Sequence, residues 1–229
     1  MILTTFSEAW EIVIEEFPYA LWETLYATIL ATVFAVLIGL PLGILLVVGE
    51  KNNILPIPKP LMTFLNWIIN IFRSIPFLIL MMLVLPLAEV IVGTKVGTLA
   101  SIVPLVIAAA PFVARLIEGS IREVDSRLVE TALSMGASPL QIIVKVLIPE
   151  ALPSIISNLT IALTTILGYT AMSGAIGGGG LGKIAISYGY YRFNMPVMIM
   201  AVIVLILLVQ GFQSLGTFIA NKIDRRAKN

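Results

Sequence analysis

The sequence contains neither cysteine nor histidine, and it is poor in charged residues. The chain therefore has no disulfide, no thiolate nucleophile, no imidazole for proton transfer and none of the commonest metal ligands. Only 12% of its 229 residues are charged and 59% are hydrophobic, whereas an ordinary soluble domain has about 25% charged residues. This composition excludes a water-soluble protein and an intrinsically disordered one, and it indicates that the lipid bilayer is the solvent.

The few charges nearly cancel, because 14 Lys and Arg stand against 13 Asp and Glu. A net charge of +1 creates no global basic field, so we expect no nucleic-acid partner. Partners must be recognised by local patches. The missing residue types remove most catalytic sets, and the acidic residues do not cluster near one depth of the membrane. We therefore expect that the chain is not an enzyme by itself and carries no cofactor and no metal.

Long uncharged runs set the expected architecture. About 20 apolar residues cross the hydrocarbon core, and a charge at a helix centre costs about 2.5–3.5 kcal/mol. Four runs qualify, and the third is long enough to include a loop: Thr24 to Gly49, Val96 to Ala114, Ala151 to Gly182 and Phe193 to Asn221. A fifth run, from Pro60 to Ala88, is interrupted only by Arg73. The sequence predicts an all-α polytopic membrane protein with five transmembrane helices.

The basic residues predict how these helices are oriented, since short cytoplasmic loops are enriched in Lys and Arg. With the N-terminus outside and the C-terminus in the cytoplasm, the cytoplasmic segments hold most of the basic residues: Lys51, Lys59, Arg73, Arg115, Arg122, Arg127, Lys145, Lys222, Arg225, Arg226 and Lys228. Only Lys95, Lys183 and Arg192 then lie outside. This orientation places the basic segment 220–229 in the cytoplasm as a short tail.

The N-terminal segment, residues 1–20, has a different character. It is acidic and has no basic residue, so it does not resemble a cleavable signal peptide, which needs a positive n-region. Trp10, Ile14 and Phe17 alternate with glutamates at helical spacing. We expect a short amphipathic helix on the outer surface.

The segment from Glu118 to Glu150 is the largest hydrophilic piece of the chain and is predicted to form two short helices. Ser126 is expected to cap a first helix over residues 128–135, which Gly136 ends in a left-handed conformation. Ser138 and Pro139 then begin a second helix. The pattern alone fits either a helical hairpin lying on the membrane or an element that docks on another protein.

Two stretches of this loop, residues 129–139 and 148–153, resemble the signature cytoplasmic loop of permeases of ABC importers. Glu130, Ala132 and Gly136 match that signature, and Thr131 replaces its first alanine. Other segments resemble the methionine importer permeases among them: residues 73–77, 92–94, 109–115, 168–172 and the later glycine run. Together these segments span about Leu21 to Ile219, which the resemblance identifies as a type I importer transmembrane domain, residues 21–219.

This resemblance implies a homodimer of five-span subunits in a prokaryotic inner or plasma membrane. It also implies two cytoplasmic ATPase subunits and an external substrate-binding protein that delivers D- or L-methionine. The residues that would couple the loop to the ATPase are Leu128, Glu130, Thr131, Ala132, Met135, Gly136 and Pro139. Another amino acid or small solute is an open alternative, because nothing in the spans selects a thioether. A channel without ATP coupling would leave the signature loop unexplained.

A run of four glycines, Gly177, Gly178, Gly179 and Gly180, ends near Lys183 with the spacing of a phosphate-binding P-loop. Ile184 stands where such a loop needs a hydroxyl for magnesium, and the predicted topology places the run outside. Nucleotide binding is therefore not expected. Consecutive glycines permit positive φ and close backbone approach, so the run is expected to be either a hinge at the outer mouth or a plain linker.

Other polar and bending positions lie within the predicted spans. Arg73 either snorkels to the headgroups or has a function, and Pro76 is expected to kink the second span. The other four spans have no charge in their middle, which argues against a carrier coupled to protons or sodium. The fourth span is rich in hydroxyls, and Thr164, Tyr169 and Met172 are candidates for the translocation path or gate, with helix packing as the alternative role.

Overall fold

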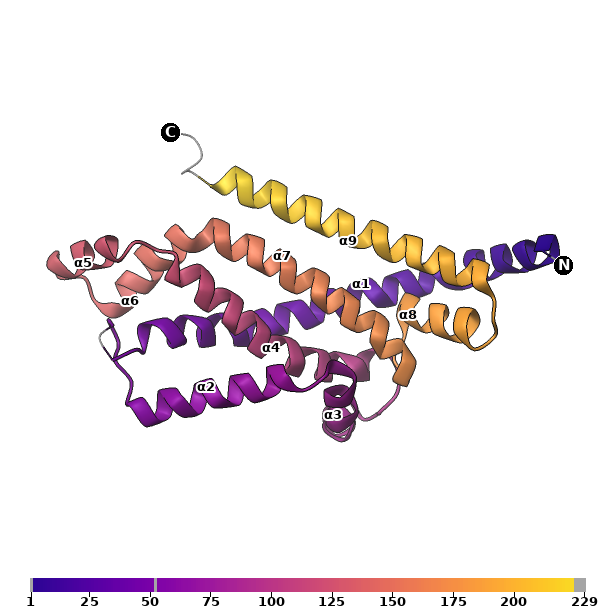
Figure 1. Ribbon diagram of the computed structural model, residues 1–229, viewed down its shortest axis with the longest axis horizontal. Helices are drawn as coiled ribbons and strands as arrows, with labels where there is room; N and C mark the ends of the chain where they lie inside the picture. The colour runs from indigo at the N-terminus through magenta and orange to yellow at the C-terminus, as the bar shows by residue number, and fades with distance from the viewer. Residues whose placement is uncertain (1, 52, 225–229) are drawn as a thin grey trace. The chain divides into compact units, whose positions relative to one another are not determined.

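The computed structural model describes residues 2–51 and 53–224, with side chains considered from residue 9 onward. Every regular element in these ranges is a helix, which confirms the all-α prediction (Figure 1). The α-helices in chain order are α1 (Ile2–Val48), α2 (Lys59–Ser74), α3 (Phe77–Val92), α4 (Thr98–Arg122), α5 (Ser126–Ser134), α6 (Pro139–Ile142), α7 (Ile148–Ser173), α8 (Gly180–Ile184) and α9 (Met195–Ile223).

Four stretches of the described chain are long and apolar enough to cross a membrane: Ala9–Val48, Thr98–Arg122, Pro139–Ile176 and Met195–Ile223. The bent pair of α2 and α3 makes five if it counts as one broken span. The structure therefore agrees with a multi-pass membrane protein. The orientation of the helices stays a prediction.

The second predicted span is broken rather than kinked. α2 ends at Ser74, and Pro76 precedes α3 in an extended conformation with ψ 134°. Proline lacks the N–H that a continuous helix needs, and it disfavours helical geometry at the residue before it. Pro76 therefore acts as expected, but its effect is stronger than a bend within one helix.

The described chain forms two compact units, and α1, α4, α7 and α9 each contribute a part to both. The first unit comprises Met1–Val33, Ile75–Ala109 and Leu163–Phe212, and the second comprises Phe34–Ser74, Ala110–Ala162 and Gln213–Asn229. A core in the first unit joins α1, α8 and α9 through Ala9, Phe17, Ala20, Leu181, Ile184, Val197 and Ala201. A smaller core in the second unit joins α1, α2 and α4 through Leu46, Ile69 and Ala114.

Close packing of α1 on α4 in the second unit depends on glycine. A Cβ atom at Gly39 would lie 2.7 Å from Cγ1 of Val113, and one at Gly43 would lie 2.5 Å from the carbonyl oxygen of Ala114. Small residues let transmembrane helices approach closely, where dispersion contacts replace the missing hydrophobic drive.

The N-terminal segment is helical as expected, but it is not a separate helix. It continues into α1 without a break. Phe17 is buried in the first unit's core, whereas Trp10 and Ile14 are exposed. The expected apolar stripe is therefore divided between the protein's own core and the surface. The basic residues of the predicted tail, Arg225, Arg226 and Lys228, lie outside the described residues.

The fourth predicted span begins earlier than its apolar run. From Pro139 the chain is helical to Ile176, through a π-helical turn at Ile143–Leu147 and then α7. Pro153 is accommodated inside α7. The loop that the run was expected to contain begins at Gly177, which has φ 92°.

Candidate functional site

The first helix of the loop is held by a cap at each end. The carboxylate of Asp125 accepts a hydrogen bond from the backbone N–H of Arg127 at 2.9 Å, so Asp125 and not Ser126 is the N-cap. An aspartate there satisfies one of the free N–H groups of the first turn. Hydrogen bonds from Arg127 hold the pKa of the Asp125 carboxyl below its usual range.

The turn between α5 and α6 has the predicted chemistry. Gly136 has φ 77°, and its N–H donates to the carbonyl of Leu133 at 2.9 Å. Ser138 caps α6 in a capping box with Gln141, and Pro139 occupies the first turn. Because glycine adopts this left-handed conformation without steric cost, Gly136 fixes the direction in which the chain leaves α5.

The loop presents exposed apolar side chains, and one of them, Leu133, also lines a cavity in the second unit. α5 has no buried residue. Met135 is 83% exposed and Leu140 is 70% exposed, and Leu128 and Leu133 are also exposed. We call these four residues the loop surface. Contiguous exposed apolar residues at a polar loop are typical of a contact site for another protein.

On its other side, α5 borders a cavity of about 530 Å³ in the second unit. Val129, Glu130 and Leu133 of the loop line it, together with Glu50 and Asn53 from the connection between α1 and α2. Glu130 therefore faces the rest of the chain, whereas Met135 does not line this cavity. The signature positions of the loop thus divide into an inner and an outer set.

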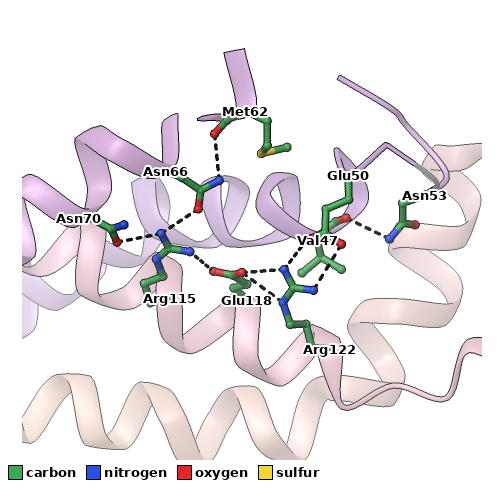
Figure 2. Close-up of polar contacts among 9 residues, drawn as sticks. All are labelled: Val47, Glu50, Asn53, Met62, Asn66, Asn70, Arg115, Glu118 and Arg122. Atoms are coloured by element: carbon green, nitrogen blue, oxygen red, sulfur yellow. Dashed lines mark hydrogen bonds and ion pairs between the residues drawn. The ribbon is translucent and has the colours of Figure 1, made fainter. Parts of the chain in front are cut away.

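A chain of polar contacts crosses the second unit beside this cavity (Figure 2). The guanidinium of Arg122 forms ion pairs with two carboxylates, at 2.6 Å from Oε1 of Glu50 and 2.9 Å from Oε1 of Glu118. Glu118 forms a second ion pair, with the guanidinium of Arg115, at an N–O distance of 2.6 Å. Arg115 then donates to two asparagines of α2, to Oδ1 of Asn66 at 2.8 Å and to Oδ1 of Asn70 at 3.0 Å. We call these six residues the arginine ladder.

The sequence prediction did not include this ladder. Its signal is visible in hindsight, because Arg115, Glu118 and Arg122 are spaced to share one face of a helix and alternate in sign. The side chains of Arg115 and Glu118 are only 20% and 12% exposed. A half-buried charge needs its partner, since removing one leaves the other desolvated and unpaired.

The glycine run is packed tightly in the first unit. Glu23 of α1 accepts the backbone N–H of Gly180 at 2.8 Å and the hydroxyl of Thr98 at 2.5 Å. The hydroxyl of Thr24 accepts the N–H of Leu181 at 2.9 Å. A Cβ at Gly179 would lie 2.0 Å from the Thr98 hydroxyl oxygen. Glycine is required here for close approach, and the run is not a loose linker.

These contacts also argue against a phosphate site in the run. A P-loop presents free backbone N–H groups to its phosphates, but here the carboxylate of Glu23 accepts the N–H of Gly180. A second anion at the same place would be repelled by that carboxylate. The hydroxyl that magnesium would need is absent, since Ile184 is a buried apolar residue.

The path candidates lie along the part of α7 that belongs to the first unit. The ring of Tyr169 stacks on Phe77 of α3 with centroids 4.3 Å apart and planes 6° apart. Thr164 is half-buried and Met172 is exposed. This arrangement lets Met172 meet another molecule, while Tyr169 is already held by an aromatic contact.

Arg73 lies in the last turn of α2, two residues before the break at Ile75, and is exposed. A cation there interacts favourably with the negative end of the helix dipole. Snorkelling and a functional role both stay predictions for Arg73, because it lies at the break within the bent pair of α2 and α3.

Comparisons with known proteins show which proteins this chain is similar to. The model of the family "Binding-protein-dependent transport system inner membrane component" matches residues 39–228. The "Probable D-methionine transport system permease protein MetI" of Vibrio cholerae is 49% identical over 207 residues, 90% of this chain and 92% of that protein. The "Methionine import system permease protein MetP" of Bacillus subtilis is 47% identical over 69% of this chain and 72% of that protein.

A solved structure is similar as well. It is described as an inward-facing conformation of the MetNI methionine ABC transporter, in its native CY5 crystal form, and it is 44% identical in sequence. The match covers 94% of this chain and 99% of that chain, with a TM-score of 0.91. An amino acid ABC transporter crystallised with histidines has a TM-score of 0.75 at 21% identity, which shows a shared fold alone.

Proposed function

The chain belongs to the family of inner membrane components of binding-protein-dependent transport systems, and from that premise we propose that it is the permease subunit of an ATP-driven methionine importer. The proposal is supported by relatives whose names specify methionine and which align over most of their length. Methionine in its D or L form, or both, is the proposed substrate.

We propose three partners for this subunit. A second copy of the chain forms the other half of the path, two cytoplasmic ATPase subunits supply energy, and an external binding protein delivers the substrate. The name MetNI of the similar structure and the name of the family support these partners. Catalysis then resides on the ATPase subunits and not on this chain.

The observation that carries the proposal is the loop surface on a structured helix pair. Leu128 and Met135 of the loop surface, with Ala132 between them, recur at helical spacing along α5 and its C-cap, as a helix needs to dock in a groove. Thr131 donates its hydroxyl to the carbonyl of Arg127 at 2.7 Å within the same helix, which leaves its methyl group free to pack. From Pro139 a continuous helix leads to Ile176, so movement of α5 is transmitted to the span as a rigid body.

The same proposal assigns roles to the other candidates. Thr164, Tyr169 and Met172 line the path or its gate, and Met172 from two copies closes it. Gly177, Gly178, Gly179 and Gly180 form a fixed corner at the outer mouth, with Arg73 and Pro76 at the break of the second span. Residues 1–20 are external, 21–219 form the transmembrane domain, and 220–229 form a cytoplasmic tail.

Labelling of single cysteines tests the orientation, because the chain has no native thiol. Lys51→Cys and Arg122→Cys should react with an impermeant maleimide only when the cytoplasmic side is accessible. Lys95→Cys and Lys183→Cys should react from outside. Reaction of position 183 only from the cytoplasm would reverse the orientation and every placement that depends on it.

Reconstituted uptake tests the function. The chain, its co-purified ATPase and the binding protein in proteoliposomes should accumulate radiolabelled methionine only with ATP. The chain alone should not hydrolyse ATP. Uptake of a different solute with the same ATP dependence would correct the substrate, and solute flux without ATP would indicate a channel.

A further inference from the structure

The arginine ladder is stronger at one end than at the other. Arg122 lies between two carboxylates, Glu50 and Glu118, and attraction between opposite charges holds all three. Arg115 shares Glu118 but reaches α2 only through the neutral amide oxygens of Asn66 and Asn70. The bonds to α2 therefore lack the Coulomb attraction of the ion pairs along α4.

Among the described residues, the two bonds from Arg115 to Asn66 and Asn70 are also the polar connection between α2 and α4. Asn66 and Asn70 are one turn apart, so the guanidinium of Arg115 holds two successive turns of α2. Asn66 donates its own amide to the carbonyl of Met62 at 2.9 Å, which directs its oxygen towards Arg115. Ile69 is the one buried side chain among the described residues of α2. α2 is thus attached by a small apolar contact and by Arg115.

Separation of α2 from α4 would leave every charge of the ladder paired. Arg115 would keep Glu118, and the freed amide oxygens of α2 would accept hydrogen bonds from water. Opening the other end would instead separate the opposite charges of Glu50 and Arg122, which are 48% and 44% exposed, and would lose their Coulomb attraction. In addition, Nε of Arg115 is buried and has no partner among the described residues, so this arrangement does not use all donors of the guanidinium.

We propose that Arg115, Asn66 and Asn70 are a latch that releases and recaptures α2 in each transport cycle, while Glu50, Arg122 and Glu118 are a permanent clamp. This inference rests on the proposed function, because α5 is the element that the ATPase moves. α5 begins four residues after Arg122, so its movement reaches α4 at the ladder. The three latch residues are positioning residues, which time the movement of α2 to that of the loop.

Two double variants change the latch in opposite directions. Asn66→Leu with Asn70→Leu keeps the number and branching of the side-chain heavy atoms and removes both acceptors, so α2 is released too easily. Asn66→Asp with Asn70→Asp converts the contacts to ion pairs with Arg115, so α2 is held. Thr63→Val is the matched control, since Thr63 is exposed on the same helix and no side-chain hydrogen bond is described for it.

The readout is the number of ATP molecules hydrolysed per methionine imported, in complexes shown to contain the ATPase. The leucine pair should raise this ratio about fivefold, the change expected when a hydrogen bond is lost from one of two states. The aspartate pair should slow hydrolysis and import together and leave the ratio unchanged. Thr63→Val should match the unmodified protein in both.

A distance measurement tests the movement itself. Spin labels on Thr63→Cys and Gly119→Cys, in dimers with one labelled copy, report the separation of α2 and α4. We expect two distances that exchange with nucleotide state, only the long one in the leucine pair and only the short one in the aspartate pair. One unchanged distance in all nucleotide states, or a normal ATP ratio in the leucine pair, refutes the latch. A complex that changes distance with ATP but imports no methionine refutes the proposed substrate and not the latch.

Discussion

The loop that carries the loop surface and the glycine run each make a bend between helices, but different kinds of contact fix the two bends. The loop is shaped by its own residues, with Asp125 and Ser138 as caps and Gly136 at the turn, and its apolar side chains remain uncovered. The glycine run is shaped by residues far away in sequence, Glu23 and Thr98, and Gly178, Gly179 and Gly180 are buried. A bend that its own residues fix can leave its side chains exposed for a partner. A bend that distant residues fix is instead part of the protein's core.

The comparison predicts the largest effect at Gly179. Gly179→Ala would place a Cβ atom 2.0 Å from the Thr98 hydroxyl and 2.5 Å from the Glu23 carboxylate, so the α1 contact must open. We expect loss of most folded protein, because overpacking and an unpaired carboxylate each cost about 1–3 kcal/mol. Yield and thermal unfolding in detergent measure this.

Gly119→Ala is the control for that substitution. Gly119 is exposed within α4, and a Cβ there would meet nothing within 4 Å. Alanine should stabilise the helix by about 0.5–1 kcal/mol. If Gly119→Ala and Gly179→Ala lose equal amounts of folded protein, an added methyl group is harmful at both sites, and the close packing of Gly179 is not the cause.

The second prediction concerns the loop and should spare the fold. Ala132→Trp adds a large ring to α5, which has no buried residue, so the unfolding temperature should change little. The co-purifying ATPase should be lost, together with uptake, because the ring prevents a helix from entering a groove. Ser134→Ala, which removes only a bond within α5, should keep both. Full ATPase association in Ala132→Trp would make the loop a plain connector.

The third prediction separates conformation from contact at Gly136. Its φ is 77° and a Cβ would touch nothing, so only the backbone conformation penalises a side chain. Gly136→Val should cost about 2 kcal/mol and reduce uptake roughly tenfold while the ATPase stays bound. Gly136→Asn should be close to normal, since asparagine tolerates the left-handed region. Identical uptake in the two variants would contradict a role for this turn.

The smallest expected effect is at the second cap. Ser138→Ala removes the acceptor of the capping box and should cost about 1 kcal/mol of local stability. Amide hydrogen exchange of residues 140–142 should accelerate severalfold, with uptake nearly unchanged. Faster exchange throughout α7 would mean that the cap supports the whole span.

Sequence patterns predicted the parts whose structure is locally determined. The spans, the left-handed Gly136 and the start at Pro139 all follow from periodicity, proline and glycine, whereas at Pro76 the sequence predicted a kink and the structure has a break. The cap of α5 was placed one residue too late, because Asp125 and Ser126 are both good caps and only the geometry distinguishes them.

Sequence patterns did not predict the arrangements that need distant partners. The role of Glu23 depends on a backbone N–H at Gly180, 157 residues later, and the ladder joins Glu50, in the connection after α1, to residues of α2 and α4. Sequence spacing shows which side chains share one face of a helix, but it does not show which other helix packs against that face. For the same reason the N-terminal segment, predicted as a surface helix, turned out to bury Phe17 against α8 and α9.

The π-helical turn at residues 143–147 has a consequence for changes in chain length. Such a turn holds one residue more than an α-helical turn, and one residue corresponds to about 100° of rotation in an α-helix. Because the wider turn accommodates the extra residue, removal of a single residue there would restore a regular helix and leave α5 and α6 facing nearly the same direction about the axis of the span. Removal of a residue from the regular part of α7 would instead rotate them by about 100°, so the chain should tolerate a one-residue difference in length better at this turn than within α7.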